Sequence, residues 1–300
     1  MNILHLALVS ESNDGAIDRG MVKRGHNVTR IDWRRDGVKA NNAALLSVGK
    51  ADVVFYQGQG GKTIRPEVLQ RLKEGGAYVV NWTGDVRDDV DWYANMAPYV
   101  NLTLFTNLTD VDKMAEMGHR ADYLQTGYDD RIYNLGEPKP REGVVFMGNN
   151  YGHRFPQGVD RIAMVDTMQR EFGADFKLFG KGWPGRVHLH SLSEVIEYRR
   201  SVVAINFDHY LRPMFASDRI LRAQACGCAV VSQGYPGIGD EHSLVGSCAT
   251  VDDMVKMVRY ALNNPDKAKA LGEQSAKHVA QSCTWERRIE QLEQLILKHE

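Results

Sequence analysis

The first half of the chain alternates between short apolar runs and stretches in which apolar residues recur every three or four positions. The apolar runs, each of a length that suits a buried strand, cover residues 3–9, 27–32, 52–56, 77–82, 102–105 and 122–124. The stretches with helical periodicity lie near residues 16–25, 41–49, 66–74 and 110–117. Strands that alternate with such helices form βαβ units, so the pattern predicts a parallel sheet with helices on both faces.

The same alternation restarts after residues 136–141, a polar segment with two prolines that is typical of an interdomain linker. Beyond it, strands are expected at residues 144–147, 176–179, 202–206 and 229–232. Helices are expected near residues 158–172, 192–199 and 217–226, and from residue 251 onward. We therefore predict an α/β fold of two doubly wound Rossmann-like domains, residues 1–138 and 142–283, that face a central cleft. Ligands of such sheets bind outside the carboxyl ends of the strands.

Composition narrows the class of protein but not its function. The 300 residues carry a formal net charge of −1, with 43% hydrophobic and 25% charged residues, which is ordinary for a globular protein. This charge gives no general attraction to nucleic acids or acidic membranes. The four cysteines lack zinc-site spacing, and the N-terminal apolar run is too short to cross a bilayer. We expect a cytoplasmic protein with free thiols and no membrane span.

Residues 217–227 carry the clearest chemical signal in the chain. Ser217 suits an N-cap, and Gly227 stands at the position where a helix of this length ends. Arg219 and Arg222, three residues apart, share one helix face near its start. Two guanidinium groups beside the positive end of a helix dipole form an anion site that suits a diphosphate. From spacing alone, two solvated surface arginines are an equal alternative.

The pattern Ser-x-Arg-x-Leu-x-Ala-x-Ala-Cys-Gly at residues 217–227 resembles the donor-binding region of GT-B glycosyltransferases. It is most similar to the group around the spore-maturation protein CgeB. Arg222 stands where that group usually carries an acidic residue. Residues 145–150 with Arg154 resemble the group's phosphate-facing strand and glycine turn, and residues 179–183 resemble its base-contacting element. In GT-B proteins the last helix, here residues 284–300, crosses back onto the N-terminal domain.

The resemblance implies a glycosyltransferase that moves a sugar from a nucleotide-diphosphate donor, a UDP-sugar, to a hydroxyl acceptor without a metal or other cofactor. The donor-binding residues that it implies are Gly148, Asn149, Arg154, Lys181, Ser217, Arg219 and Arg222. The acceptor stays open among a small molecule, a glycan, a protein and modified DNA. Two alternatives remain, a nucleotide-sugar epimerase with the GT-B fold and a catalytically degenerate nucleotide-sugar-binding protein.

Asp85 is the candidate catalytic residue. It lies in the loop after the apolar run at residues 77–80, within a segment that resembles the Trp-x-x-Asp loop of the same group. A carboxylate there is expected to accept the proton of the acceptor hydroxyl. Trp82 is expected to offer a flat surface for a sugar or a base. The alternative for Asp85 is a helix N-cap before Val86.

Three other motifs are weaker. Residues 58–63, Gly-Gln-Gly-Gly-Lys-Thr, resemble a P-loop, but the first glycine of that motif would fall on Tyr56. Asp89-Val90-Asp91 matches a metal-binding Asp-x-Asp, but it lies in a polar stretch that favours a helix start. His188 and His190 alternate without nearby cysteines or a carboxylate pair, so we expect no metal site.

Overall fold

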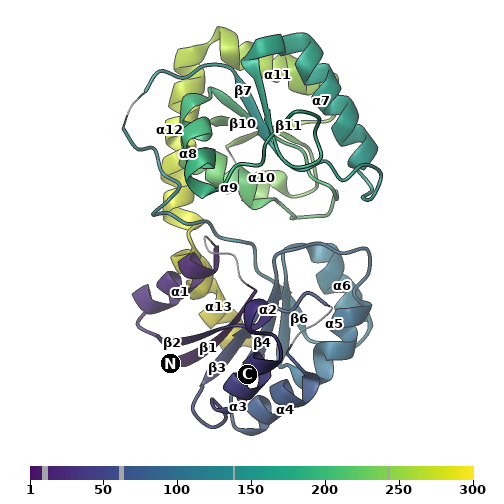
Figure 1. The fold of residues 1–300 in the computed structure, drawn as a ribbon, viewed down its shortest axis with the longest axis vertical. Helices are drawn as coiled ribbons and strands as arrows, with labels where there is room; N and C mark the ends of the chain where they lie inside the picture. The colour runs from purple at the N-terminus through teal and green to yellow at the C-terminus, as the bar shows by residue number, and fades with distance from the viewer. Residues whose placement is uncertain (9–12, 61–63, 138, 242–243) are drawn as a thin grey trace. The chain divides into compact units, whose positions relative to one another are not determined.

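The chain folds into two compact α/β units (Figure 1). The computed structural model describes residues 1–8, 13–60, 64–137, 139–241 and 244–300. One unit comprises Met1–Gly127 and Thr284–Glu300, and the other comprises Tyr128–Cys283. The first unit is therefore built from two separate segments of the sequence.

The first unit is a parallel sheet with helices on both faces. Its six strands lie in the order β2–β1–β3–β4–β5–β6. They are β1 (Asn2–Ala7), β2 (Asn27–Asp32), β3 (Val53–Tyr56), β4 (Tyr78–Thr83), β5 (Leu102–Phe105) and β6 (Ala121–Tyr123). The helices are α1 (Asn13–Lys23), α2 (Trp33–Asp36), α3 (Val38–Leu45), α4 (Pro66–Glu74), α5 (Asp91–Met96), the 3₁₀ helix η1 (Ala97–Tyr99), α6 (Leu108–Glu116) and α13 (Trp285–His299).

The C-terminal helix α13 completes the core of the first unit. Thr284 caps it by accepting a hydrogen bond from the Arg287 N–H (3.4 Å). The apolar face of α13 packs with α1 and with the sheet, and its buried residues there are Trp285, Ile289, Leu292 and Ile296. Because one face of the sheet meets this helix, the first unit needs the C-terminal segment to bury its apolar surface.

The second unit repeats the same architecture with five parallel strands in the order β11–β10–β9–β7–β8. They are β7 (Val144–Met147), β8 (Phe176–Phe179), β9 (Val203–Asn206), β10 (Ala229–Gln233) and β11 (Val245–Cys248). The helices are α7 (Gly158–Phe172), the 3₁₀ helix η2 (Gly173–Asp175), α8 (Ser191–Arg200), α9 (Asp218–Ala225), α10 (Ile238–Glu241), α11 (Val251–Asn263) and α12 (Pro265–Ser282). The predicted fold class of two doubly wound parallel sheets is confirmed.

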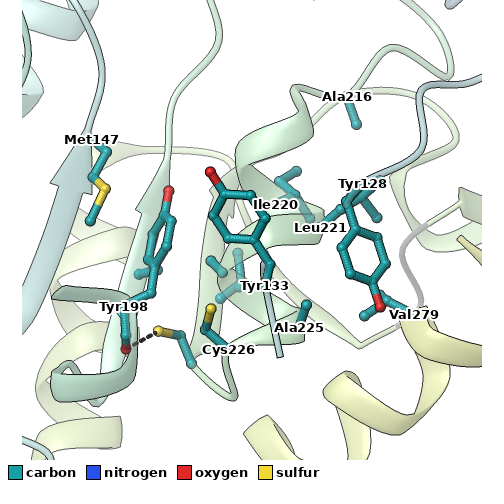
Figure 2. Close-up of a cluster of buried hydrophobic side chains, with 14 of the residues drawn as sticks. Tyr128, Tyr133, Met147, Tyr198, Ala216, Ile220, Leu221, Ala225, Cys226 and Val279 are labelled. Carbon is teal, nitrogen blue, oxygen red and sulfur yellow. Dashed lines mark hydrogen bonds between the residues drawn. The ribbon is translucent and has the colours of Figure 1, made fainter. Parts of the chain in front are cut away.

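The start of the second unit differs from the expected boundary at residues 138–142. Residues 128–137 belong to the second unit because Tyr128 and Tyr133 are buried in its core. Figure 2 shows both tyrosine rings among side chains of α9, including Ile220 and Ala225. Pro140 lies outside any helix or strand, as expected of a linker, and Pro138 lies outside the described residues. The aromatic residues before the linker decide which unit this segment belongs to.

Candidate functional site

Several predicted donor-binding residues meet at the carboxyl end of the second sheet. Strands β7 and β9 are neighbours there although β8 separates them in the sequence. This edge is thus the topological switch point, where doubly wound sheets bind ligands. A cavity of about 150 Å³ lies at this position. Its walls include four predicted residues and two carboxylates that the sequence analysis did not select: Gly148, Asn149, Arg219, Arg222, Glu194 and Asp218.

The turn after β7 is fixed from both sides. The Gly148 N–H donates to the Phe179 carbonyl (2.9 Å), and the Gly148 carbonyl accepts from the Trp183 indole N–H (2.7 Å). The Asn149 side-chain oxygen accepts from the Lys181 N–H (2.8 Å). Within the described part of the chain, the Asn149 N–H has no hydrogen-bond partner. Of the two backbone donors at this turn, only that of Asn149 is thus available to a ligand.

Arg219 lies in the first turn of α9, the helix whose N-terminus was predicted to form the anion site. The Ser217 hydroxyl caps this helix by accepting from the Arg219 N–H (3.3 Å). The Arg219 guanidinium donates to the buried carboxylate of Asp208 (3.1 Å) and to Asn206 (3.4 Å). Asp208 was not predicted, although a polar residue two positions after an apolar strand, at the carboxyl edge of a sheet, was a usable signal.

Arg222 is enclosed by two carboxylates. Its guanidinium contacts Asp218 (2.5 Å) and Glu194 (3.2 Å) and lies over the ring of Tyr133 (5.2 Å to the centroid). The Tyr133 hydroxyl donates to the same Glu194 oxygen (2.6 Å). Burial alone would lower the pKa of Arg222, but Asp218, with Tyr133 and Glu194, holds it above its ordinary value. Position 222, where the resemblance places an acidic residue, thus holds a cation that is paired with two carboxylates.

These contacts give the cavity both donors and acceptors. Arg219 and the free Asn149 N–H are donors that suit phosphate oxygens. The carboxylates of Glu194 and Asp218 line the same cavity and accept from hydroxyl groups. Nucleotide sugars present phosphate oxygens and hydroxyls to one site, so the arrangement fits that class of ligand.

Three predicted donor-binding residues lie outside the cavity walls: Ser217, which caps α9, and the exposed residues Arg154 and Lys181. Arg154 is exposed and stacks over the Phe155 ring (5.4 Å to the centroid). Lys181 is exposed too, and its backbone N–H rather than its ammonium group contacts Asn149. The structure therefore brings together Gly148, Asn149, Arg219 and Arg222 but leaves the side chains of Arg154 and Lys181 apart from them.

Asp85 lies in the first unit, in the loop that follows β4. Its side chain is 59% exposed and forms an ion pair with Arg87 (3.3 Å). Its alternative role as a helix N-cap is wrong, because the next helix, α5, begins only at Asp91. An exposed carboxylate at the carboxyl end of a central strand remains compatible with the predicted role of a base.

Trp82 does not present its face to a ligand. Only 5% of it is exposed, its indole N–H donates to the Leu124 carbonyl (2.9 Å), and its ring stacks on Phe55 and meets the edge of Trp285. The expectation that it binds a sugar or a base is wrong. The alternation along β4 turns this ring toward the face of the sheet that α13 covers, so it is part of the core.

The weaker motifs add no second site. Residues 61–63 of the glycine-rich segment lie outside the described residues. In the part of the chain that the structure describes, no group of three or more histidine, cysteine or acidic residues is placed to hold a metal ion. The described helices include none that is long and apolar enough to cross a membrane.

The fold places this protein with the GT-B glycosyltransferase structures. Anabaena Alr3699/HepE, solved in complex with UDP-glucose, is similar over 99% of this chain and 100% of its own, at 10% identity and a TM-score of 0.63. Sucrose-phosphate synthase (tll1590) from Thermosynechococcus elongatus is similar over 99% and 98%, at 11% identity and a TM-score of 0.63. A UDP-forming α,α-trehalose-phosphate synthase from Burkholderia vietnamiensis covers 90% and 80%, at 10% identity and a TM-score of 0.60.

The sequence itself points to the same class. Residues 161–294 match the family model described as glycosyl transferase-like. This match spans most of the second unit, including α8 and α9, and extends into α13. No curated protein matches the chain in sequence. The similarity to the CgeB group stays a prediction.

Proposed function

We propose that this protein is a glycosyltransferase that moves a sugar from a UDP-sugar to a hydroxyl acceptor without a metal ion. The observation that carries the proposal is the cavity at the switch point of the second sheet, where the turn after β7 meets the start of α9. The match of residues 161–294 to a glycosyl transferase-like family and the likeness to a structure holding UDP-glucose support it.

The donor-binding residues have separate roles in this proposal. Arg219, the Asn149 N–H and the first turn of α9, capped by Ser217, bind the diphosphate and stabilise the charge that develops on it as the sugar leaves. Glu194 and Asp218 accept hydrogen bonds from donor hydroxyls, and Arg222 holds both carboxylates in place. Arg154 and Lys181 bind the donor from the rim of the site. Asp85 activates the acceptor hydroxyl from the first unit.

The test is an incubation of the protein with UDP-glucose and a panel of other nucleotide sugars, with and without EDTA. We expect slow release of UDP in the absence of an acceptor, faster release with a cell extract that contains one, and no effect of EDTA. Conversion of the sugar without UDP release would identify an epimerase instead. Binding without either reaction would identify a nucleotide-sugar-binding protein.

A further inference from the structure

Arg161, in the first turn of α7, is a buried cation directly behind the proposed diphosphate site. It is 1% exposed, although it belongs to the residue types that are almost never buried without a partner. Its guanidinium donates to the Asn149 carbonyl (3.0 Å), to the Phe207 carbonyl and to His209 Nε2 (2.8 Å). It thus joins the turn after β7 to the loop after β9.

No ion pair with another described residue balances the charge of Arg161. Among the described residues no carboxylate lies within ion-pair distance of it, and the nearby Asp208 is bound to Arg219. His209 accepts from Arg161, and burial together with Arg161 and Arg219 lowers the pKa of His209 to about 3, so this ring is neutral. Burial, and then repulsion from Arg219, lowers the pKa of Arg161 itself. A buried cation in this state is stabilised by any anion that binds close by.

Arg161 and Trp183 together hold the two carbonyl groups of the turn after β7. A Cβ atom on Gly148 would lie 3.3 Å from Arg161 Nη1, so the guanidinium packs directly against the turn that lines the cavity. The Asn149 carbonyl is held by Arg161, and the Gly148 carbonyl is held by Trp183. In a trans peptide the N–H points away from the preceding carbonyl. The Asn149 N–H is therefore directed away from Trp183 and left free.

We propose that Arg161 is a positioning residue for an anionic diphosphate: it fixes the turn that presents the Asn149 N–H and adds a buried positive charge beneath it. This role rests on the proposed function, because it assigns a residue to the diphosphate of the donor. Arg219 and Arg222, the two arginines that line the cavity, are already paired with carboxylates. The role proposed for Arg161 therefore explains why a third, buried cation lies behind this cavity.

The test compares the affinities of UDP, UMP and uridine for the wild type and two variants, Arg161→Gln and Arg161→Lys. We expect Arg161→Gln to weaken UDP binding by about 10–100-fold, the range for a lost hydrogen bond that involves a charged group. Uridine binding should change by less than about threefold, since uridine carries no phosphate. Arg161→Lys keeps the positive charge but not the planar guanidinium group. Its loss of UDP affinity should therefore be smaller than that of Arg161→Gln, and its uridine affinity should also change by less than about threefold.

Arg288→Gln is the matched control. Arg288 is also buried and donates to a backbone carbonyl, that of Thr126, but it lies in the first unit. Its replacement should lower stability without changing the ratio of UDP to uridine affinity. Equal losses for UDP and uridine in both Arg161 variants would overturn the role of Arg161 alone. A wild type that binds none of the three ligands would overturn the proposed UDP-sugar donor. If Arg161→Gln does not fold, the ratio of UDP to uridine affinity in Arg161→Lys tests the proposed role of Arg161 instead.

Discussion

At the scale of single residues, the site combines positions that the sequence reveals with others that it hides. Gly148 and Arg219 could be predicted because a glycine after a strand and an arginine at a helix start have local signatures. Glu194 and Arg161 could not, because their roles come from contacts with residues 28 and 12 positions away, Arg222 and Asn149. In the sequence alone Glu194 is one more acidic residue near the start of a helix.

Arg219→Ala tests the phosphate-binding role of that side chain. We expect UDP binding to weaken by about 1.5–3 kcal/mol, the range for hydrogen bonds to charged groups, and uridine binding to weaken much less. Calorimetry with both ligands measures the difference. Arg259→Ala is the control, because Arg259 forms an exposed ion pair with Glu171 on α7 and should leave both affinities unchanged. Equal losses for UDP and uridine would remove Arg219 from the phosphate site.

Asp85→Asn tests the proposed base. The change keeps the size of the side chain but removes its ability to accept a proton, so transfer should slow by about 10²–10⁴-fold. Donor affinity should stay the same, because the change lies in the first unit. Asp89→Asn is a control in the same loop: Asp89 accepts from the Asp91 N–H, which asparagine can also do. A near-normal transfer rate in Asp85→Asn would assign acceptor activation to another group.

At the scale of elements, buried strands were the most predictable part of the fold. The expected strands at residues 144–147 and 176–179 coincide with β7 and β8. All four residues of β7 are buried and apolar, and in β8 the buried apolar residues alternate with partly exposed ones. Strand β11 was missed. Its sequence, Val-Gly-Ser-Cys, has neither an apolar run nor a clear alternation, because it lies at the edge of the sheet and only Cys248 is buried.

Gly20→Ala tests the contact between α1 and α13. Alanine normally stabilises a helix interior by about 1 kcal/mol relative to glycine. Here a Cβ atom would lie only 2.9–3.0 Å from the backbone of Trp285 and Glu286, so we expect a net loss of about 1–3 kcal/mol. Gly15→Ala in the same helix is the control, since its nearest neighbour is the flexible Arg19 side chain. Urea denaturation measures both, and a stabilised Gly20→Ala would contradict the close packing.

At the scale of the whole molecule, α13 is tied to the rest of the first unit by charges as well as by its core. Glu293 binds Arg24 (2.7 Å) and His26 (2.7 Å), and Asp122 binds His299 (2.8 Å) and Lys298 (2.7 Å). Burial alone would raise the pKa of each carboxyl, but hydrogen bonds from these partners lower it below its ordinary value. These contacts therefore contribute stability at neutral pH.

The first unit should consequently lose stability in acid. A carboxyl with a lowered pKa contributes its full stability above the unfolded value, 4.5 for Glu293 and 3.8 for Asp122, and loses it as the pH falls through the folded value. We expect the double variant Glu293→Gln, Asp122→Asn to be less stable than the wild type at pH 7 and to differ less from it at pH 3. Urea denaturation followed by tryptophan fluorescence measures this, and a difference that is independent of pH would contradict it.

The division of the first unit between two segments has a consequence for synthesis on the ribosome. The strands β1 to β6 are complete at Gly127, yet the helix that covers one of their faces follows only after the 156 residues of the second unit. At about 5–20 residues per second, the first sheet waits roughly 8–30 s with that face uncovered. The nascent N-terminal segment is thus a natural client for chaperones that bind exposed apolar surface, whereas the second unit can fold as soon as it emerges.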